Sequence, residues 1–184
     1  MKRRNFLQLP LAAAALPLAA QPIPQARPEQ GFKVESGKAR YQEELLIMGG
    51  RFECKVSGKD TGGDLCIYDT FREAKGGPAL HVHHEQDEWF YVVKGEFLFR
   101  VGEGTFNLRA GDSAFGPRKV PHTFAKTSDG AGQMLIVWQP AGSMEDFFYQ
   151  MSTMTKNIPA NPQVALKQLF ASHAMQVIGP PLKI

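Results

Sequence analysis

The chain has 184 residues, of which 43% are hydrophobic and 21% charged, a composition that excludes a disordered or collagen-like protein and predicts one globular domain with short appendages. Its formal net charge of +3 comes from Lys2, Arg3 and Arg4, because beyond residue 20 the Lys+Arg count falls from 21 to 18 and equals the 18 Asp+Glu. The balanced remainder lacks the basic surface that nucleic-acid binding needs, so we expect no nucleic-acid partner.

The first twenty residues have the layout of an export signal peptide. Three cations precede a Leu/Ala-rich stretch that Pro10 and Pro17 interrupt and that ends in small residues, with cleavage expected after Ala20. Arg3-Arg4, followed by Asn-Phe-Leu, resembles the twin-arginine signal, whose substrates cross the membrane already folded. The ordinary secretory route and a retained anchor are the alternatives. We expect a periplasmic or secreted protein with no membrane contact after cleavage.

Short apolar runs dominate the chain after this segment. Residues 21–31 carry three prolines and predict a linker or surface arm. Residues 32–141 form a succession of short strands and Gly-rich turns, which predicts an all-β sandwich or barrel. The expected strands are residues 45–48, 51–56, 65–71, 79–84, 88–93, 96–101, 105–110, 113–117, 122–126 and 134–140.

Helical periodicity occurs only in residues 142–184, which we expect to form a helical extension packed on the barrel as ordinary core. The first helix should begin with Ser143 as its cap and Asp146 three residues later. The second should begin at Asn161-Pro162 and end before the Gly-Pro-Pro of residues 179–181. Its expected buried face contains Val164, Leu166, Leu169 and Phe170.

Two cysteines, Cys54 and Cys66, lie in what reads as two strands of one hairpin on either side of a turn-rich insert. An exported protein meets an oxidising compartment, where the two could form a disulfide. Two small buried thiols are an equally good interpretation, and both remain open at this point.

Three histidines fall within four positions of one predicted strand. His81 and His83 point to the same face because side chains alternate along a strand, so the pair makes a natural metal chelate, whereas His84 points away. Glu88 follows a short polar turn, and a hairpin there would return its carboxylate toward the two imidazoles. His122 can join them only in a closed fold.

Three imidazoles and one carboxylate suit a divalent transition ion, such as Fe, Mn, Ni, Co, Cu or Zn. An inward-facing cluster of this kind would be costly to bury without a cation, so we predict one bound metal ion. The remaining histidine, His173, is expected on the surface of the second helix.

These residues carry a resemblance to the cupin superfamily. The segment His81-x-His83-x4-Glu88-x6-Gly95 matches the first cupin motif, and Gly111-x5-Pro117-x4-His122 matches most of the second. The resemblance implies a double-stranded β-helix, the cupin jelly-roll barrel, with C-terminal helices. It also implies that the metal ligands are His81, His83, Glu88 and His122.

The chain departs from the cupin pattern in its loops. Lys119 stands where a glycine is usual and Lys126 where an asparagine is usual, and Gly76 and Gly77 lie one or two positions too close to His81. These departures affect loop shape and leave the four ligand positions intact.

Residues 33–182 further resemble single-domain cupins described as quercetin-dioxygenase-like, on Thr61-Gly62-Gly63, on residues 140–148 and on residues 177–182. That resemblance favours an enzyme, an oxygenase that cleaves or oxidises a small aromatic or enolic substrate, with Glu88 as the catalytic base. A non-catalytic binding cupin and an isomerase or lyase acting on a sugar or hydroxy acid are the alternatives, since cupins host many reactions.

An aromatic substrate pocket and a small-molecule partner complete these expectations. The candidate lining residues are Phe90, Phe97, Phe99, Phe115, Phe124 and Trp138, although each can equally be barrel core. Cupins of this type commonly pair through barrel strands, so a homodimer is compatible with the resemblance.

Overall fold

The computed structural model describes residues 27–41 and 44–184. The expected signal peptide, residues 1–20, lies outside the described residues. Within the expected arm, residues 27–31 are exposed and form neither helix nor strand. No helix in the described part of the chain is long and apolar enough to cross a membrane.

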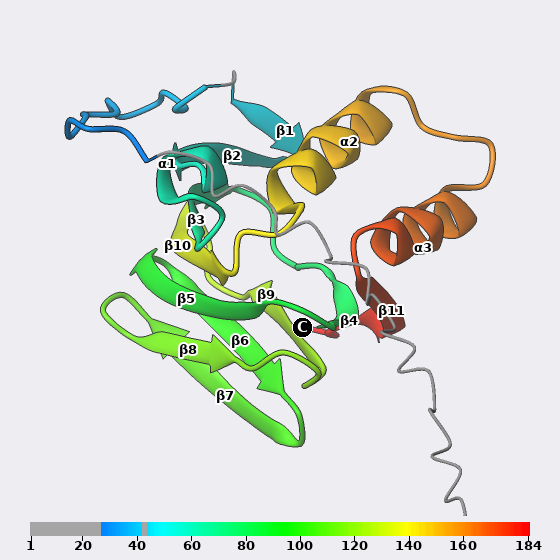
Figure 1. The fold of residues 1–184 in the computed structure, drawn as a ribbon. Coiled ribbons are helices and arrows are strands. Elements are labelled where there is room, and N and C mark those ends of the chain that lie inside the picture. The colour runs from blue at the N-terminus through cyan, green and yellow to red at the C-terminus, as the bar shows by residue number, and fades with distance from the viewer. Residues whose placement is uncertain (1–26, 42–43) are drawn as a thin grey trace, which may run out of the picture.

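Two antiparallel sheets form the body of the protein (Figure 1). The first contains, in spatial order, β1 (Leu45–Ile47), β2 (Gly50–Val56), β3 (Cys66–Arg72), β10 (Gly132–Gln139), β5 (Asp87–Lys94) and β8 (Ser113–Gly116). The second contains β11 (Met175–Pro181), β4 (Ala79–His83), β9 (His122–Lys126), β6 (Glu96–Val101) and β7 (Gly104–Arg109). Each of the ten expected strands is present, and the jelly-roll fold class is confirmed.

Alternation of side chains along the strands explains where the core lies. In β3, Cys66, Tyr68 and Thr70 are buried while the residues between them are partly exposed. In β10, Met134, Ile136 and Trp138 alternate in the same way. Because successive side chains point to opposite faces, one face of each sheet lies against the other sheet and the core forms between them.

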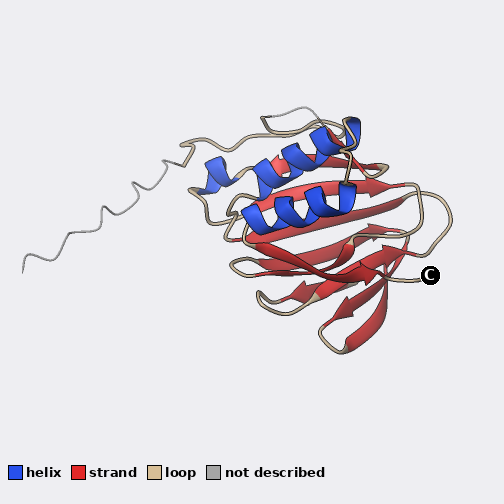
Figure 2. Ribbon diagram, turned by 90° about the vertical axis from the view of Figure 1, so that its right-hand side faces the viewer, coloured by secondary structure: helices blue, strands red, loops and turns tan. Residues whose placement is uncertain are grey.

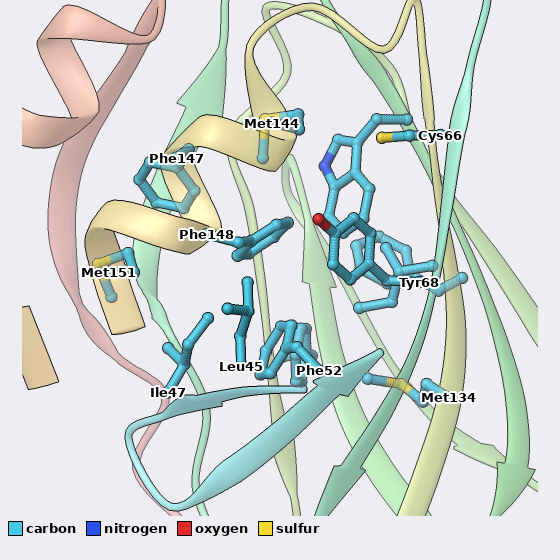
Figure 3. Close-up of a cluster of buried hydrophobic side chains, with 14 of the residues drawn as sticks. Leu45, Ile47, Phe52, Cys66, Tyr68, Met134, Met144, Phe147, Phe148 and Met151 are labelled. Atoms are coloured by element: carbon cyan, nitrogen blue, oxygen red, sulfur yellow. The ribbon is translucent and has the colours of Figure 1, made fainter. Parts of the chain in front are cut away.

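In the part of the chain that the structure describes, three helices accompany the sheets. They gather on one side of the strands (Figure 2). They are α1 (Gly58–Thr61), α2 (Met144–Lys156) and α3 (Pro162–Ser172). Helix α2 packs against β1, and α3 packs against β11. Phe148 of α2 points toward Phe52 and Tyr68, with ring centroids 5.2 and 5.0 Å away (Figure 3).

The C-terminal extension differs from the expectation in three ways. The Ser143 side chain does not cap α2; its Oγ lies 2.8 Å from Nδ1 of His173, and His173 is buried, not on the surface. Val164 is 47% exposed, while Leu169 and Phe170 are buried as expected. After α3 the chain forms β11, which pairs with β4 and completes the second sheet, so the extension is partly barrel.

Two expectations about neighbouring strands also have clear outcomes. Strands β2 and β3 pair as a hairpin, but Cys54 faces Tyr68 in the register, and both cysteines are buried free thiols. Strands β4 and β5 do not form a hairpin, because they belong to different sheets. The turn between them carries the chain across the barrel, which places Glu88 opposite the histidines.

Candidate metal centre

The three histidines come from one sheet and the carboxylate from the other. His81 and His83 lie on the inner face of β4, and His122 pairs directly with His81 in the neighbouring strand β9. Glu88 lies in β5, where it pairs with Trp138 and Gly116. The centre therefore exists only because the two sheets close on each other.

The four side chains converge within a few ångström. Oε2 of Glu88 lies 2.9 Å from Nε2 of His122 and 3.2 Å from Nε2 of His83. One potential ligand atom from each residue lies within 4.8 Å of all the others, and no member is more than 8% exposed. The exposed ring of His84 points away, as its position in the strand predicted.

Main-chain carbonyls fix the orientation of two of the rings. Nδ1 of His81 lies 2.8 Å from the carbonyl oxygen of Ala79, and Nδ1 of His122 lies 2.9 Å from that of Val120. A ring that donates its Nδ1–H to a carbonyl turns Nε2 toward the cluster, where Nε2 can bind a metal ion once it has lost its proton, as is usual around a bound metal. Gly116 leaves room for the His122 ring, because a Cβ there would lie 3.1–3.3 Å from three ring atoms.

The protonation of the cluster follows from burial and mutual contact. Burial and the neighbouring imidazoles lower the pKa of His81 to about 3, so this ring is neutral near pH 7. Burial alone would raise the pKa of Glu88, but hydrogen bonds from His122 and His83 hold that pKa well below its usual range. Burial would lower the pKa of His122, yet its hydrogen bond to the Glu88 carboxylate raises it.

This donor set fits a divalent transition ion. Three imidazole nitrogens and one carboxylate oxygen are the ligands that Fe, Mn, Ni, Co, Cu and Zn accept, and the rings are already turned toward one point. A buried cluster of three imidazoles is also poorly satisfied by one carboxylate, and Nδ1 of His83 has no hydrogen-bond partner among the described residues. His81, His83, Glu88 and His122 would hold the ion.

A cavity of about 90 Å³ opens directly on the cluster and is bounded by His81, His83 and Glu88. Most of its wall is apolar. Helix α2 contributes four side chains, and further apolar residues come from β1, α3 and both sheets. The α2 residues are Met144, Phe147, Phe148 and Met151.

The structure distributes the expected pocket residues over three environments. Phe124 and Trp138 line the cavity. Phe90, Phe97 and Phe99 are buried in the core and do not line it. Phe115 is 54% exposed, so the expectation for this residue is wrong. In β8 it is Ala114 and Gly116 that face inward, which turns Phe115 outward.

The departures from the cupin pattern have local explanations. Lys119 adopts the left-handed conformation (φ 66°) that a glycine would adopt readily. Buried Lys126 donates hydrogen bonds to the carbonyl oxygens of Glu73 and Ser128, at 3.0 and 2.6 Å. Gly77 passes so close to β9 that a Cβ there would lie 1.7 Å from the carbonyl oxygen of Phe124. Lys119 and Gly77 lie in loops and Lys126 ends strand β9, and all three leave the candidate ligands in place.

Two contributors to the site were not predicted. The α2 side chains were assigned to ordinary core, and nothing in the helical pattern distinguishes a cavity wall from core. Arg72, which also lines the cavity, could have been found, because it continues the inward series of Cys66, Tyr68 and Thr70 in β3.

The fold and the site together define a small jelly-roll barrel that encloses three histidines and a glutamate, a candidate metal centre, beside an apolar cavity. Residues 70–138 match the Cupin domain family. This match spans all four candidate ligands and, with the fold, supports membership of the cupin superfamily.

Comparison with known proteins identifies several partial relatives. The chain is 29% identical over 89 residues to 3-hydroxyanthranilate 3,4-dioxygenase 2 of Aspergillus clavatus, which covers 46% of this chain and 45% of that protein. It is 28% identical over 67 residues to an uncharacterised protein of Methanocaldococcus jannaschii, and this match covers 36% of this chain and 54% of that protein. The chain thus spans about half the length of these curated relatives. An RmlC-like cupin from Shewanella frigidimarina is 28% identical, with a TM-score of 0.48 and coverage of 58% of this chain and 89% of that one.

Proposed function

We propose that this protein is a metal-dependent cupin oxygenase, of the quercetin-dioxygenase-like kind, that oxidises or cleaves a small aromatic or enolic substrate. The observation that carries the proposal is the direct opening of the three-histidine, one-glutamate cluster into an apolar cavity. The relative named 3-hydroxyanthranilate 3,4-dioxygenase supports an oxygenase, although the match covers less than half of either chain.

The bound metal ion would supply the electrophilic and redox chemistry that brings substrate and dioxygen together. Glu88 has the position of a general base. Its Oε2 is engaged by His83 and His122, while Oε1 makes no hydrogen bond with the described residues. Since the carboxyl group borders the cavity and is ionised near pH 7, Oε1 can accept a proton from a substrate hydroxyl.

The apolar wall has two effects on such a reaction. The aromatic and methionine side chains of α2 make the space above the cluster apolar, which strengthens electrostatic interactions inside it. The same wall favours a substrate with an aromatic or aliphatic body over a sugar, because a sugar's hydroxyl groups would find few hydrogen-bond partners there.

Oxygen consumption by metal-loaded protein tests this function. The full chain would be loaded in turn with Fe, Mn, Ni, Co and Cu and incubated with catechols and flavonols while dissolved oxygen is recorded. We expect uptake with at least one metal and its loss in Glu88→Gln, with His84→Gln as the matched control. Absence of uptake with every metal would overturn the ring-cleaving proposal and favour a non-catalytic binding barrel.

We also propose that the chain is exported by the twin-arginine route, on the basis of Arg3-Arg4 and the Leu/Ala-rich stretch that follows. Expression of the full chain in a Gram-negative host should place a shortened form in the periplasm. Replacing both arginines by lysine should retain the protein in the cytoplasm, while Lys2→Gln should not. Export of the double-lysine variant at the normal level would contradict the proposal.

A further inference from the structure

We propose that Arg72 binds an anionic group of the cavity's ligand, so that the substrate is a small aromatic acid whose carboxylate contacts Arg72. This inference names the substrate class for the site described above and rests on the proposed function only for the reaction that follows binding.

The position of Arg72 directs it toward the cavity. It is the last residue of β3 and continues the inward-facing series of that strand, and it lines the same cavity as His81, His83 and Glu88. The residues that pair with it on both neighbouring strands are glycines, Gly50 in β2 and Gly132 in β10. No side chain from these two positions can therefore cover or engage the guanidinium group.

Arg72 has no charged partner in the described part of the chain. It makes no ion pair and no side-chain hydrogen bond with any described residue, whereas Arg40 pairs with Asp60 and Arg118 with Asp87. Burial lowers the pKa of Arg72, and no carboxylate opposes that effect. The guanidinium nevertheless stays protonated in any protein environment near pH 7.

An unpaired cation that lines an apolar cavity is energetically unfavourable, because its hydration is reduced and no opposite charge replaces the lost water. The ring of Phe124 offers partial compensation, with its centroid 5.7 Å from the guanidinium carbon. A ligand carboxylate would supply the missing negative charge and match the guanidinium with two parallel hydrogen bonds.

The remaining lining defines the rest of the ligand. Phe124 lies two residues after His122 in β9 and directly beside Arg72, so an aromatic side chain separates the cation from the metal ligands. A molecule that reaches both Arg72 and a metal ion held by the cluster would carry oxygen donors at its metal end, an apolar body in the middle and an anionic group at its Arg72 end. The cavity volume of about 90 Å³ restricts this body to a small one.

Binding of a matched acid and amide tests the inference. The full chain would be loaded with Zn²⁺, which is redox-inert and prevents turnover, and titrated by calorimetry with 3,4-dihydroxybenzoate and with 3,4-dihydroxybenzamide. The two probes share the catechol end and differ in charge at the other. We expect the acid to bind at least about 10-fold more tightly than the amide.

Variants then assign the difference to Arg72. Arg72→Gln should weaken binding of the acid by about 10-fold or more and change binding of the amide little, while Arg72→Lys should restore part of the loss. Arg118→Gln is the matched control, since Arg118 is an exposed cation already paired with Asp87. Circular dichroism and zinc content would verify that each variant is folded and loaded. If Arg72→Gln does not fold, the acid-to-amide comparison in the unaltered chain still tests whether the cavity prefers an anionic ligand.

Equal affinity for acid and amide, or an Arg72→Gln variant that binds the acid normally, would overturn the inference. Tighter binding of lactate than of the aromatic acid would overturn the aromatic part. Oxygen uptake measurements separate this inference from the proposed function. Uptake with 3,4-dihydroxybenzoate that is unaffected by Arg72→Gln would reject the role of Arg72 and keep the oxygenase. Arg72-dependent binding of the acid without oxygen uptake would keep the role of Arg72 and reject the oxygenase.

Discussion

The contact between Glu88 Oε2 and His122 Nε2, 2.9 Å long, joins the two sheets of the barrel at the candidate metal centre. Glu88 belongs to β5 in one sheet and His122 to β9 in the other. The ligand set is therefore also a link between the sheets, and metal binding and barrel stability should be coupled, because a ligand that binds only the folded state stabilises it.

Removal of a single ligand should abolish metal retention. We expect His122→Ala to lower the affinity for Zn²⁺ by more than about 100-fold, because even changes around the ligands cost 10- to 100-fold. Metal content after purification and competition with a chelator would measure this. His84→Ala, from the adjacent exposed histidine, is the matched control, and an equal loss in that variant would contradict the assignment of the ligands.

A substitution next to the centre tests how closely the barrel holds the His122 ring. Gly116→Ala places a Cβ 3.1–3.3 Å from the ring, a tight contact that the ring must relieve by moving. We expect metal affinity to fall by about 10-fold with the fold retained, since the orientation of a ligand is sensitive to its surroundings. Gly104→Ala, with only ordinary contacts, should leave affinity unchanged. Normal affinity in Gly116→Ala would show that the ring has space to spare.

Period-two patterning explains why the strands were predictable. Ten strands were located because short apolar runs ended at Gly, Pro or Asp. The His81–His83 pair was recognised because the two residues share one strand face, whereas the full set of four candidate ligands was implied by the resemblance to cupins. Strand β11 was missed because its Gly179-Pro180-Pro181 reads as a terminator, whereas at the edge of a sheet proline is tolerated.

The parts of the site that were mispredicted depend on tertiary packing. The choice of inward face in β8 rests on its pairing with β5, in which Phe115 faces the exposed Trp89. A strand of four residues contains too little alternation to settle its orientation from sequence. Burial of His173 depends on its contact with Ser143, thirty positions earlier, which no local pattern reveals.

The two thiols should be inert in the folded protein. Burial raises the pKa of Cys54 to about 12 and raises that of Cys66 as well, so neither forms the reactive thiolate near pH 7. We expect a thiol-specific chromogenic reagent to react only as fast as the protein unfolds. In denaturant without reductant, both thiols should react at once. If the thiols did not react with the reagent in denaturant, the two cysteines would be joined in a disulfide.

Asp60 should make the fold sensitive to acid. Burial alone would raise the pKa of Asp60, but hydrogen bonds from Tyr41, Arg40 and the Ser57 amide lower it below the ordinary value. A carboxyl group whose pKa is lower in the folded state contributes stability that is complete above its unfolded pKa. That contribution is lost as the pH falls through the folded pKa.

Replacement of this carboxylate should therefore cost stability only where it is ionised. We expect Asp60→Asn to lower the free energy of unfolding by about 1–2 kcal/mol at neutral pH, because it removes the carboxylate that accepts the Ser57 amide and binds Arg40. In urea titrations, the difference from the unaltered chain should persist above about pH 4, the ordinary pKa of an aspartate, and shrink as the pH falls below it. Glu103→Gln, at an exposed position, is the control. A difference that stays constant over this range would show that Asp60 acts through packing and not through its charge.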